Sequence, residues 1–236
     1  MRAHSENENL NAIENARIEM DIALANVAAA RDHARSALEA GDKLGTPYAR
    51  VTGLAAIATA HRLNEQWDEA VAVLQEAVSA ATGGLYRIGE GWFRAELAEA
   101  LLGRGDLDQA EHEAQTAVTV AHARHSRCHE IRANLALART QLRRACAQAL
   151  DRAEQTLLCT QELIDETGAR LYQPGVHECR AHLAQLRGDT SSVRRELDAA
   201  RRLYAEMGAT AQVERLSKEM DGSERRALLG EPGAKS

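Results

Sequence analysis

A repeat with a period close to 40 residues constrains the fold of this chain more than any other feature. Three columns of residues follow it, and small side chains dominate two of them. They are Ala37, Ala77, Ala117, Thr160 and Ala200; Ala30, Ala70, Ala110, Ala153 and Val193; and Asn26, Gln66, Asp106, Ala149 and Asp189. In each column the spacings are 40, 40, 43 and 40. Columns that share one period predict a stack of similar helical units, a solenoid.

Composition indicates that those units are helical. Aromatic residues are only 3% of the chain and hydrophobic residues 44%, so Ala, Leu, Val and Ile must build the core. Alanine is the strongest helix former, and small side chains let helices approach closely. None of the prolines, Pro47, Pro174 and Pro232, interrupts a predicted helix interior. We therefore expect an all-α fold.

About five helix pairs and a C-terminal capping helix fit this pattern. We expect first helices near residues 10–24, 47–63, 86–102 and 128–143 and after Pro174, and second helices near 26–42, 67–81, 107–122, 150–166 and 189–206. A short helix over 211–220 would cap the last pair. The predicted organisation is a polar N-terminal tail over 1–9, one repeat domain over 10–220 and a disordered tail over 221–236.

Two turns carry the tripeptide Arg-Gly-Asp, at 104–106 and 187–189. The glycine permits the turn, and we expect the aspartate to cap the second helix. Gln109 stands three residues after Asp106, which is the spacing of a capping box. The turn over 144–148 lacks this signature, so we place the three extra residues of the fourth unit there.

The units resemble tetratricopeptide repeats, most clearly in AELAEALLGRGDLDQAEHEAQTAVTVA of the third unit. The segments ETGARLYQPGVHECRAHLAQLRGD and RRELDAARRLYAEMGATAQVERLSKEM are similar to the C-terminal region of bacterial AAA-type or STAND-type ATPase regulators, many of which carry a class III adenylate or guanylate cyclase domain. The resemblance implies a right-handed superhelix whose first helices line a concave groove.

The resemblance covers only the repeat region of that family. A nucleotide-binding P-loop needs a lysine after a glycine-rich loop, and Lys43, Lys218 and Lys235 do not occur in that arrangement. No strand-rich segment is available for a cyclase sheet. We therefore expect a protein that is not an enzyme and needs no cofactor.

Charge and hydropathy limit the partners. The net charge is −6 with both signs interspersed, so no basic stripe favours direct binding of nucleic acid. No apolar run reaches the length of a membrane span. We expect a cytoplasmic protein with reduced cysteines, and a homodimer contact is one hypothesis for the N-terminal face near Leu10 and Ile13.

Two sets of residues are candidate sites. His122, His125, Cys128 and His129 cluster across one junction between helices and have the side chains of a metal site, although their spacing matches no zinc signature and a polar loop explains them as well. Arg50, Arg87, Trp92, Arg94 and Arg132 fall on predicted first helices and could anchor a peptide carboxylate or an apolar side chain. For Arg94 the alternative is local pairing with Glu90, four residues earlier.

These observations favour a protein–protein interaction module in bacterial signalling or transcriptional regulation. It would hold a peptide or partner domain, such as an ATPase, cyclase or transcription factor, in the concave groove. One alternative is the regulatory part of a split ATPase or adenylate cyclase that acts in trans. Another is a sensor that binds a small ligand within the superhelix.

Overall fold

The computed structural model describes residues 47–84 and 87–229, together with isolated positions between 29 and 43. Side chains are described for most of these residues, but not for 47–50, 52, 88 and 222–229. The first predicted pair, over 10–42, and the proposed dimer contact near Leu10 and Ile13 lie outside the described residues.

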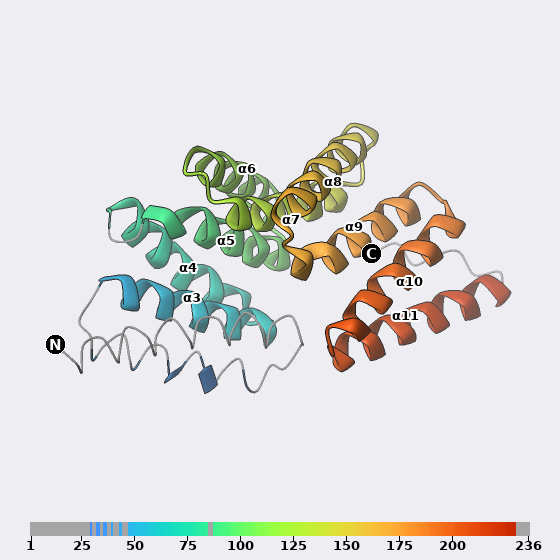
Figure 1. Ribbon diagram of the computed structural model, residues 1–236, viewed down its shortest axis with the longest axis horizontal. Coiled ribbons are helices and arrows are strands. Elements are labelled where there is room, and N and C mark those ends of the chain that lie inside the picture. The colour runs from blue at the N-terminus through green and yellow to red at the C-terminus, as the bar shows by residue number, and fades with distance from the viewer. Residues whose placement is uncertain are drawn as a thin grey trace.

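Nine α-helices follow one another around an arch in the described part of the chain (Figure 1). The first helices of the pairs are α3 (Pro47–Leu63), α5 (Glu90–Arg104), α7 (Arg127–Arg144) and α9 (Gln173–Leu186). The second helices are α4 (Trp67–Thr82), α6 (Leu107–Ala123), α8 (Ala147–Thr167) and α10 (Thr190–Glu206). Helix α11 (Thr210–Leu229) ends the stack, and the short 3₁₀ helices η1 (Arg87–Gly89) and η2 (Arg170–Tyr172) precede α5 and α9. The predicted α-solenoid is thus confirmed.

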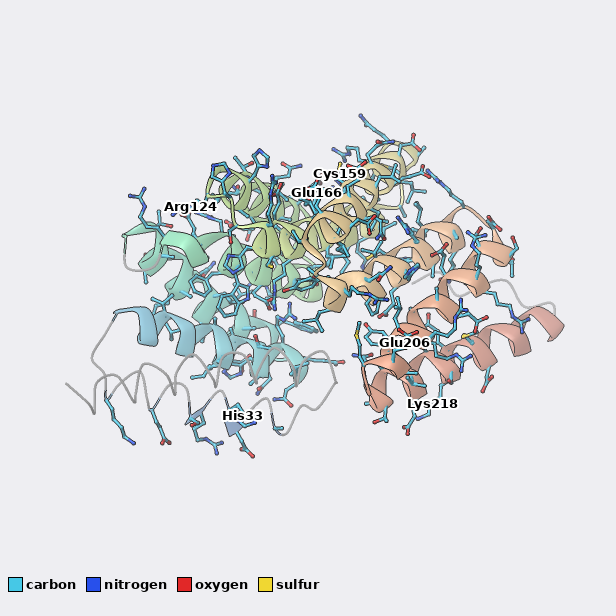
Figure 2. The ribbon with its side chains drawn as sticks, in the orientation of Figure 1. His33, Arg124, Cys159, Glu166, Glu206 and Lys218 are labelled. Atoms are coloured by element: carbon cyan, nitrogen blue, oxygen red, sulfur yellow. The ribbon has the colours of Figure 1, made fainter. Side chains whose placement is uncertain are left out.

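The repeating small residues form the contacts between helices. Two columns are buried without exposed surface at Ala70, Ala77, Ala110, Ala117, Ala153, Thr160 and Ala200. Larger side chains such as Leu74, Phe93 and Leu101 fill the space between these close approaches. Outside these contacts, helix α8 carries the exposed Cys159, which Figure 2 labels.

Each turn between a first and a second helix uses one residue in the left-handed region. Gly105 and Gly188 take this conformation as predicted, but Glu65 and Ala145 adopt it too, with φ values of 58° and 51°. After Gly105, the backbone N–H of Asp106 donates to the carbonyl of Leu101 at 2.9 Å, which is the long hydrogen bond of a Schellman motif. The turn therefore belongs to the repeat, and glycine only makes it easier to form.

The position predicted for the three extra residues is wrong. The second helices begin at Trp67, Leu107, Ala147 and Thr190, so the starts are 40, 40 and 43 residues apart. The turn before α8 therefore keeps its normal length, and α8 itself is longer, with 21 residues against 17 in α6. Three residues are close to one turn at 3.6 residues per turn, so the insertion leaves Ala153 and Thr160 on the buried face.

Two other sequence expectations are corrected. Helix α11 continues to Leu229, nine residues past its predicted end, so residues 221–229 of the predicted disordered tail are helical. Strong helix formers dominate 224–229 and outweigh the cost of Gly222. Asp106 does not cap α6, because its carboxylate accepts a hydrogen bond from Nε of Arg104 at 2.6 Å.

Asp189 does cap its helix as predicted. Its Oδ1 accepts a hydrogen bond from the backbone N–H of Ser192 at 3.0 Å. The hydroxyl and backbone N–H of Ser192, with the hydroxyl of Ser191, lower the pKa of the Asp189 carboxyl to about 2.

The arginine at the end of a first helix joins it to the preceding second helix. Three ion pairs of this kind link residues 36 positions apart: Arg104–Asp68 at 3.4 Å, Arg144–Asp108 at 2.6 Å and Arg187–Asp151 at 3.1 Å. These aspartates are largely exposed, so each pair adds little to stability on its own. Their repetition explains the arginine of both Arg-Gly-Asp tripeptides.

Candidate interaction surface

Glu96 is the centre of the surface formed by neighbouring first helices. It lies on α5 and forms ion pairs with Arg62 of α3 at 3.3 Å and with Arg132 of α7 at 3.4 Å. All three side chains are less than 20% exposed. A single carboxylate therefore ties three successive first helices, and the charges on this surface are fixed in position before any partner binds.

Aromatic rings hold the predicted groove residue Arg132. Its guanidinium carbon lies 5.8 Å from the ring centre of Trp92 and 5.4 Å from that of Tyr172. Nε of Arg132 also donates to the Tyr172 hydroxyl at 2.9 Å, and His129 stacks on Trp92 with ring centres 6.2 Å apart. The structure thus brings together two of the predicted groove residues, Trp92 and Arg132.

A second ion pair lies further along the same helices, between Glu99 of α5 and Arg139 of α7. Burial alone would raise the pKa of the Glu99 carboxyl, but the charges of Arg139 and Arg62 outweigh burial and lower it. Arg139 also contacts the buried Cys179 thiol of α9. Burial raises the pKa of this thiol to about 11, so Cys179 is protonated at neutral pH.

Cations outnumber anions next to this pair. Arg143, one turn after Arg139 on α7, is exposed and forms no hydrogen bond or ion pair with the described residues. With Arg62, Trp67 and Gly103 it lines a cavity of about 380 Å³. Its charge lowers the pKa of the imidazole of His182, which burial lowers already.

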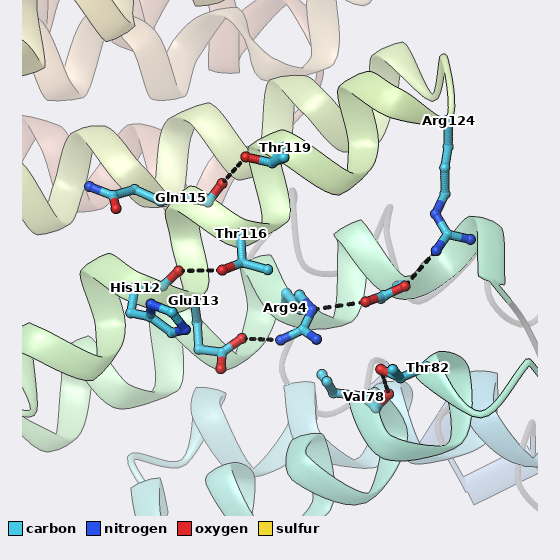
Figure 3. A network of polar contacts seen from close by, with 10 residues as sticks. Val78, Thr82, Arg94, His112, Glu113, Gln115, Thr116, Thr119 and Arg124 are labelled. Carbon is cyan, nitrogen blue, oxygen red and sulfur yellow. Dashed lines mark hydrogen bonds and ion pairs between the residues drawn. The ribbon is translucent and has the colours of Figure 1, made fainter.

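The other predicted groove arginines are in different surroundings. Arg94 is only 16% exposed and donates to Glu90 of its own helix at 3.1 Å and to Glu113 of α6 at 2.7 Å (Figure 3). The local pairing of Arg94 with Glu90 is therefore confirmed. Arg87 is exposed on η1, and the side chain of Arg50 lies outside the described residues.

The candidate metal ligands face different neighbours. Nδ1 of His122 lies 2.8 Å from Glu130 Oε1, and Nδ1 of His129 lies 2.8 Å from the Ser126 hydroxyl. His125 takes a left-handed turn conformation, and Cys128 is exposed. Among the described residues, no three His, Cys, Asp or Glu side chains lie close enough together to hold a metal ion.

Sequence analysis missed Arg62, Glu96, Arg139 and Tyr172. The available signal was their spacing. Glu96 and Arg132 are 36 residues apart, as in the ion pairs at the helix ends, and Arg132 and Tyr172 are one 40-residue period apart. An acidic residue followed by arginine about one repeat later thus marks contact between neighbouring repeats.

Known structures share this fold. A crystal structure of a putative kinesin light chain from Podosopora anserina, with nearly identical TPR-like repeats, is 16% identical; the match covers 82% of this chain and 96% of that chain, with a TM-score of 0.52. A substituted variant of that protein matches at 16% identity over 88% and 99% of the two chains, with a TM-score of 0.54. No family model matches the chain, and no curated protein matches it.

At this identity the likeness shows the fold alone. No helix in the part of the chain that the structure describes has the length and apolar character to cross a membrane. The chain has a TPR-like helical repeat fold.

Proposed function

We propose that this protein is a non-catalytic interaction module that binds an acidic peptide segment of a partner protein on the surface of its first helices. The unpaired Arg143 beside the cavity carries this proposal, because its guanidinium is available and neighbouring arginines are already fixed. Arginine binds carboxylates through two parallel hydrogen bonds. Trp67, half-buried at the same cavity, offers an aromatic surface for an apolar neighbour of that carboxylate.

Charge supports an acidic ligand. Arg62, Arg132, Arg139 and Arg143 face this surface, whereas Glu96 and Glu99 are the carboxylates that pair with them there. The local excess is positive although the whole chain carries −6. Complementary charge of this kind increases association rates and selects partners.

The resemblance to bacterial ATPase and cyclase regulators supports a role in signalling or transcriptional control. A partner from those classes would bring its own catalytic domain, and this chain would position or regulate it. The cavity is also within the size range of small-ligand sites, so the first experiment should distinguish a protein partner from a small ligand.

That experiment is affinity capture from the native cell extract, read by mass spectrometry. The tagged parent is compared with Arg143→Ala and with Arg202→Ala, an exposed arginine of α10 that serves as matched control. Loss of one enriched protein in Arg143→Ala alone supports the proposal and names the partner. Equal capture by all three proteins contradicts it, as does a ligand-dependent thermal shift in a small-molecule screen when no protein is enriched.

A further inference from the structure

A second groove lies on the side of the second helices. It runs between α8 and α10, has α9 as its floor and encloses about 360 Å³. A corresponding groove of about 430 Å³ lies two repeats earlier, between α4 and α6 over α5. The ion pair on the wall of each groove establishes the correspondence: Arg94–Glu113 at 2.7 Å in the earlier one and His177–Glu196 at 2.8 Å in the later one. Both members of the later pair lie 83 residues after their counterparts.

The same offset of 83 residues shows how the later groove differs. Its wall carries Leu158 where the earlier groove has Gln75, and its floor carries Arg180 where the earlier groove has Leu97. The repeat between them follows the earlier form, with Gln115 and Leu137 at these positions. Among these three repeats, the polar and apolar positions are thus exchanged in the last one alone.

Leu158 is exposed, whereas the other apolar residues of the groove are buried. Leu158 is 48% exposed, against the buried Leu157, Leu183 and Ala184 of the same groove. The longer α8 packs against α9 less extensively than α6 packs against α7. The groove therefore presents Leu158 to solvent beside a largely buried apolar strip of Leu157, Leu183 and Ala184.

The arginine is available to a ligand. Arg180 is half-buried and forms no hydrogen bond or ion pair with the described residues. Glu196 is close enough that the charge of Arg180 helps to lower the pKa of its carboxyl. Arg195, on the facing wall, is 66% exposed, donates hydrogen bonds to Glu196 and to the Ser192 hydroxyl, and lies near Asp189. Arg187, at the groove end, is already paired with Asp151 and Glu154.

We propose that this groove is a second docking site, which takes a segment of a partner protein with an acidic residue next to an apolar one. The carboxylate would bind Arg180, with Arg195 turning toward it, and the apolar side chain would cover Leu158 and the strip of Leu183 and Ala184. The groove lining holds three arginines and three carboxylates, but Glu154, Asp189 and Glu196 already accept hydrogen bonds from Arg187, Ser192 and Arg195. The guanidinium of Arg180 therefore selects the acidic residue, and the exposed leucine selects its apolar neighbour. The site is separate from the one proposed on the first helices, so one chain could hold two partner segments.

The test starts from a random peptide display library selected on the immobilised full chain. Selected peptides are then synthesised with a fluorescent label, and their Kd is measured by anisotropy for the parent and for the double variant Leu158→Gln/Arg180→Leu. This variant installs the residues found at the equivalent positions of the two earlier repeats, so it is compatible with the repeat. We expect a group of peptides that share an acidic residue beside an apolar one and bind the variant at least tenfold more weakly.

Two controls separate this site from the rest of the surface. Gln75→Leu makes the reverse change at the equivalent position of the earlier groove and should leave Kd unchanged, as should Arg143→Ala on the first helices. Changing the acidic residue of the peptide to its amide should weaken binding to the parent about tenfold and leave binding to the double variant nearly unaffected. Circular dichroism of each variant confirms that it is folded.

Three results would overturn the proposal. One is that every selected peptide binds the parent and the folded double variant with the same Kd, or that no peptide is selected. A second is a group of distinguishing peptides without acidic residues. The third is an amide peptide that binds the parent as tightly as its acidic form.

Discussion

Gly103 provides a sharp test of how the second and third pairs pack. It lies near the end of α5, directly beneath the ring of Trp67, which opens α4. A Cβ added at Gly103 would lie 2.5 Å from both Cε3 and Cζ3 of that ring. Such a distance is far inside van der Waals contact, so the ring or the helix would have to move. Gly103→Ala should therefore destabilise the protein although alanine is the better helix former.

The magnitude follows from two opposing effects. Alanine in place of glycine inside a helix gains up to about 1 kcal/mol. Overpacking a filled contact costs about 1–3 kcal/mol. Gly175 of α9 is the matched control, because a Cβ there would lie 3.5 Å from its nearest neighbours, an ordinary contact. Gly103→Ala should thus be less stable than Gly175→Ala by about 1–3 kcal/mol, the size of the overpacking cost.

The assay is urea unfolding followed by far-ultraviolet circular dichroism. For a chain of this length, 1 kcal/mol also corresponds to about 2–4 °C in the thermal midpoint. In a Trp67→Ala background the ring is absent, so there is no clash. Gly103→Ala should then be neutral or stabilising. If Gly103→Ala is as stable as Gly175→Ala with Trp67 in place, the close packing of the ring on α5 is refuted.

Three further predictions follow from the turns, the thiols and the cap. Ala145→Gly should raise the free energy of unfolding by about 0.5–1 kcal/mol, because removing the Cβ of a left-handed residue gains about 1–2 kcal/mol and the conformational entropy of glycine offsets about 0.5–1 kcal/mol of that gain; an unchanged urea midpoint would contradict it. Cys179, 4% exposed and with its thiol pKa raised by burial to about 11, should resist a thiol reagent such as DTNB at pH 7 until the protein unfolds, while the exposed Cys128, Cys146 and Cys159 react at once. The lowered pKa of Asp189, about 2, contributes stability that is present above pH 4 and is lost as the pH falls toward 2, so the stability difference between the parent and Asp189→Asn should shrink over that range in urea titrations and should not stay constant.

The core was predictable because packing of the repeats requires it. A small side chain is needed wherever two helices come close, so the alanine columns of the sequence fall at buried positions. The position of the insertion was not predictable in the same way. A Gly-Asp pair marks two of these turns in the sequence, whereas Ala145 forms the same turn without such a pair. The sequence therefore does not show that the turn before α8 has the normal length.

The candidate site was predictable only in part, for a related reason. Residue type singled out Trp92 and Arg132, which do meet. Their common neighbour Tyr172 lies on the 3₁₀ helix η2, outside the first helices on which the groove residues were expected. Arg94 has the same residue type as Arg132 but is held by Glu90 and Glu113. Whether an arginine faces a ligand or a neighbouring helix depends on which acidic residues the next helix presents, and that requires the packing.

The repeat itself then supplies the comparison that a single sequence lacks. Equivalent positions in successive units occupy the same place in the repeat, so a change of polarity between them calls for an explanation. Leu97 and Leu137 fill the groove floor in two units, and Arg180 gives up that apolar contact in the third. Because an unpaired arginine in a partly buried position costs free energy, its presence there calls for a compensating interaction. Within the described residues the charge of Glu196 is nearby, but no side chain forms a hydrogen bond or ion pair with Arg180, and a bound carboxylate would supply one.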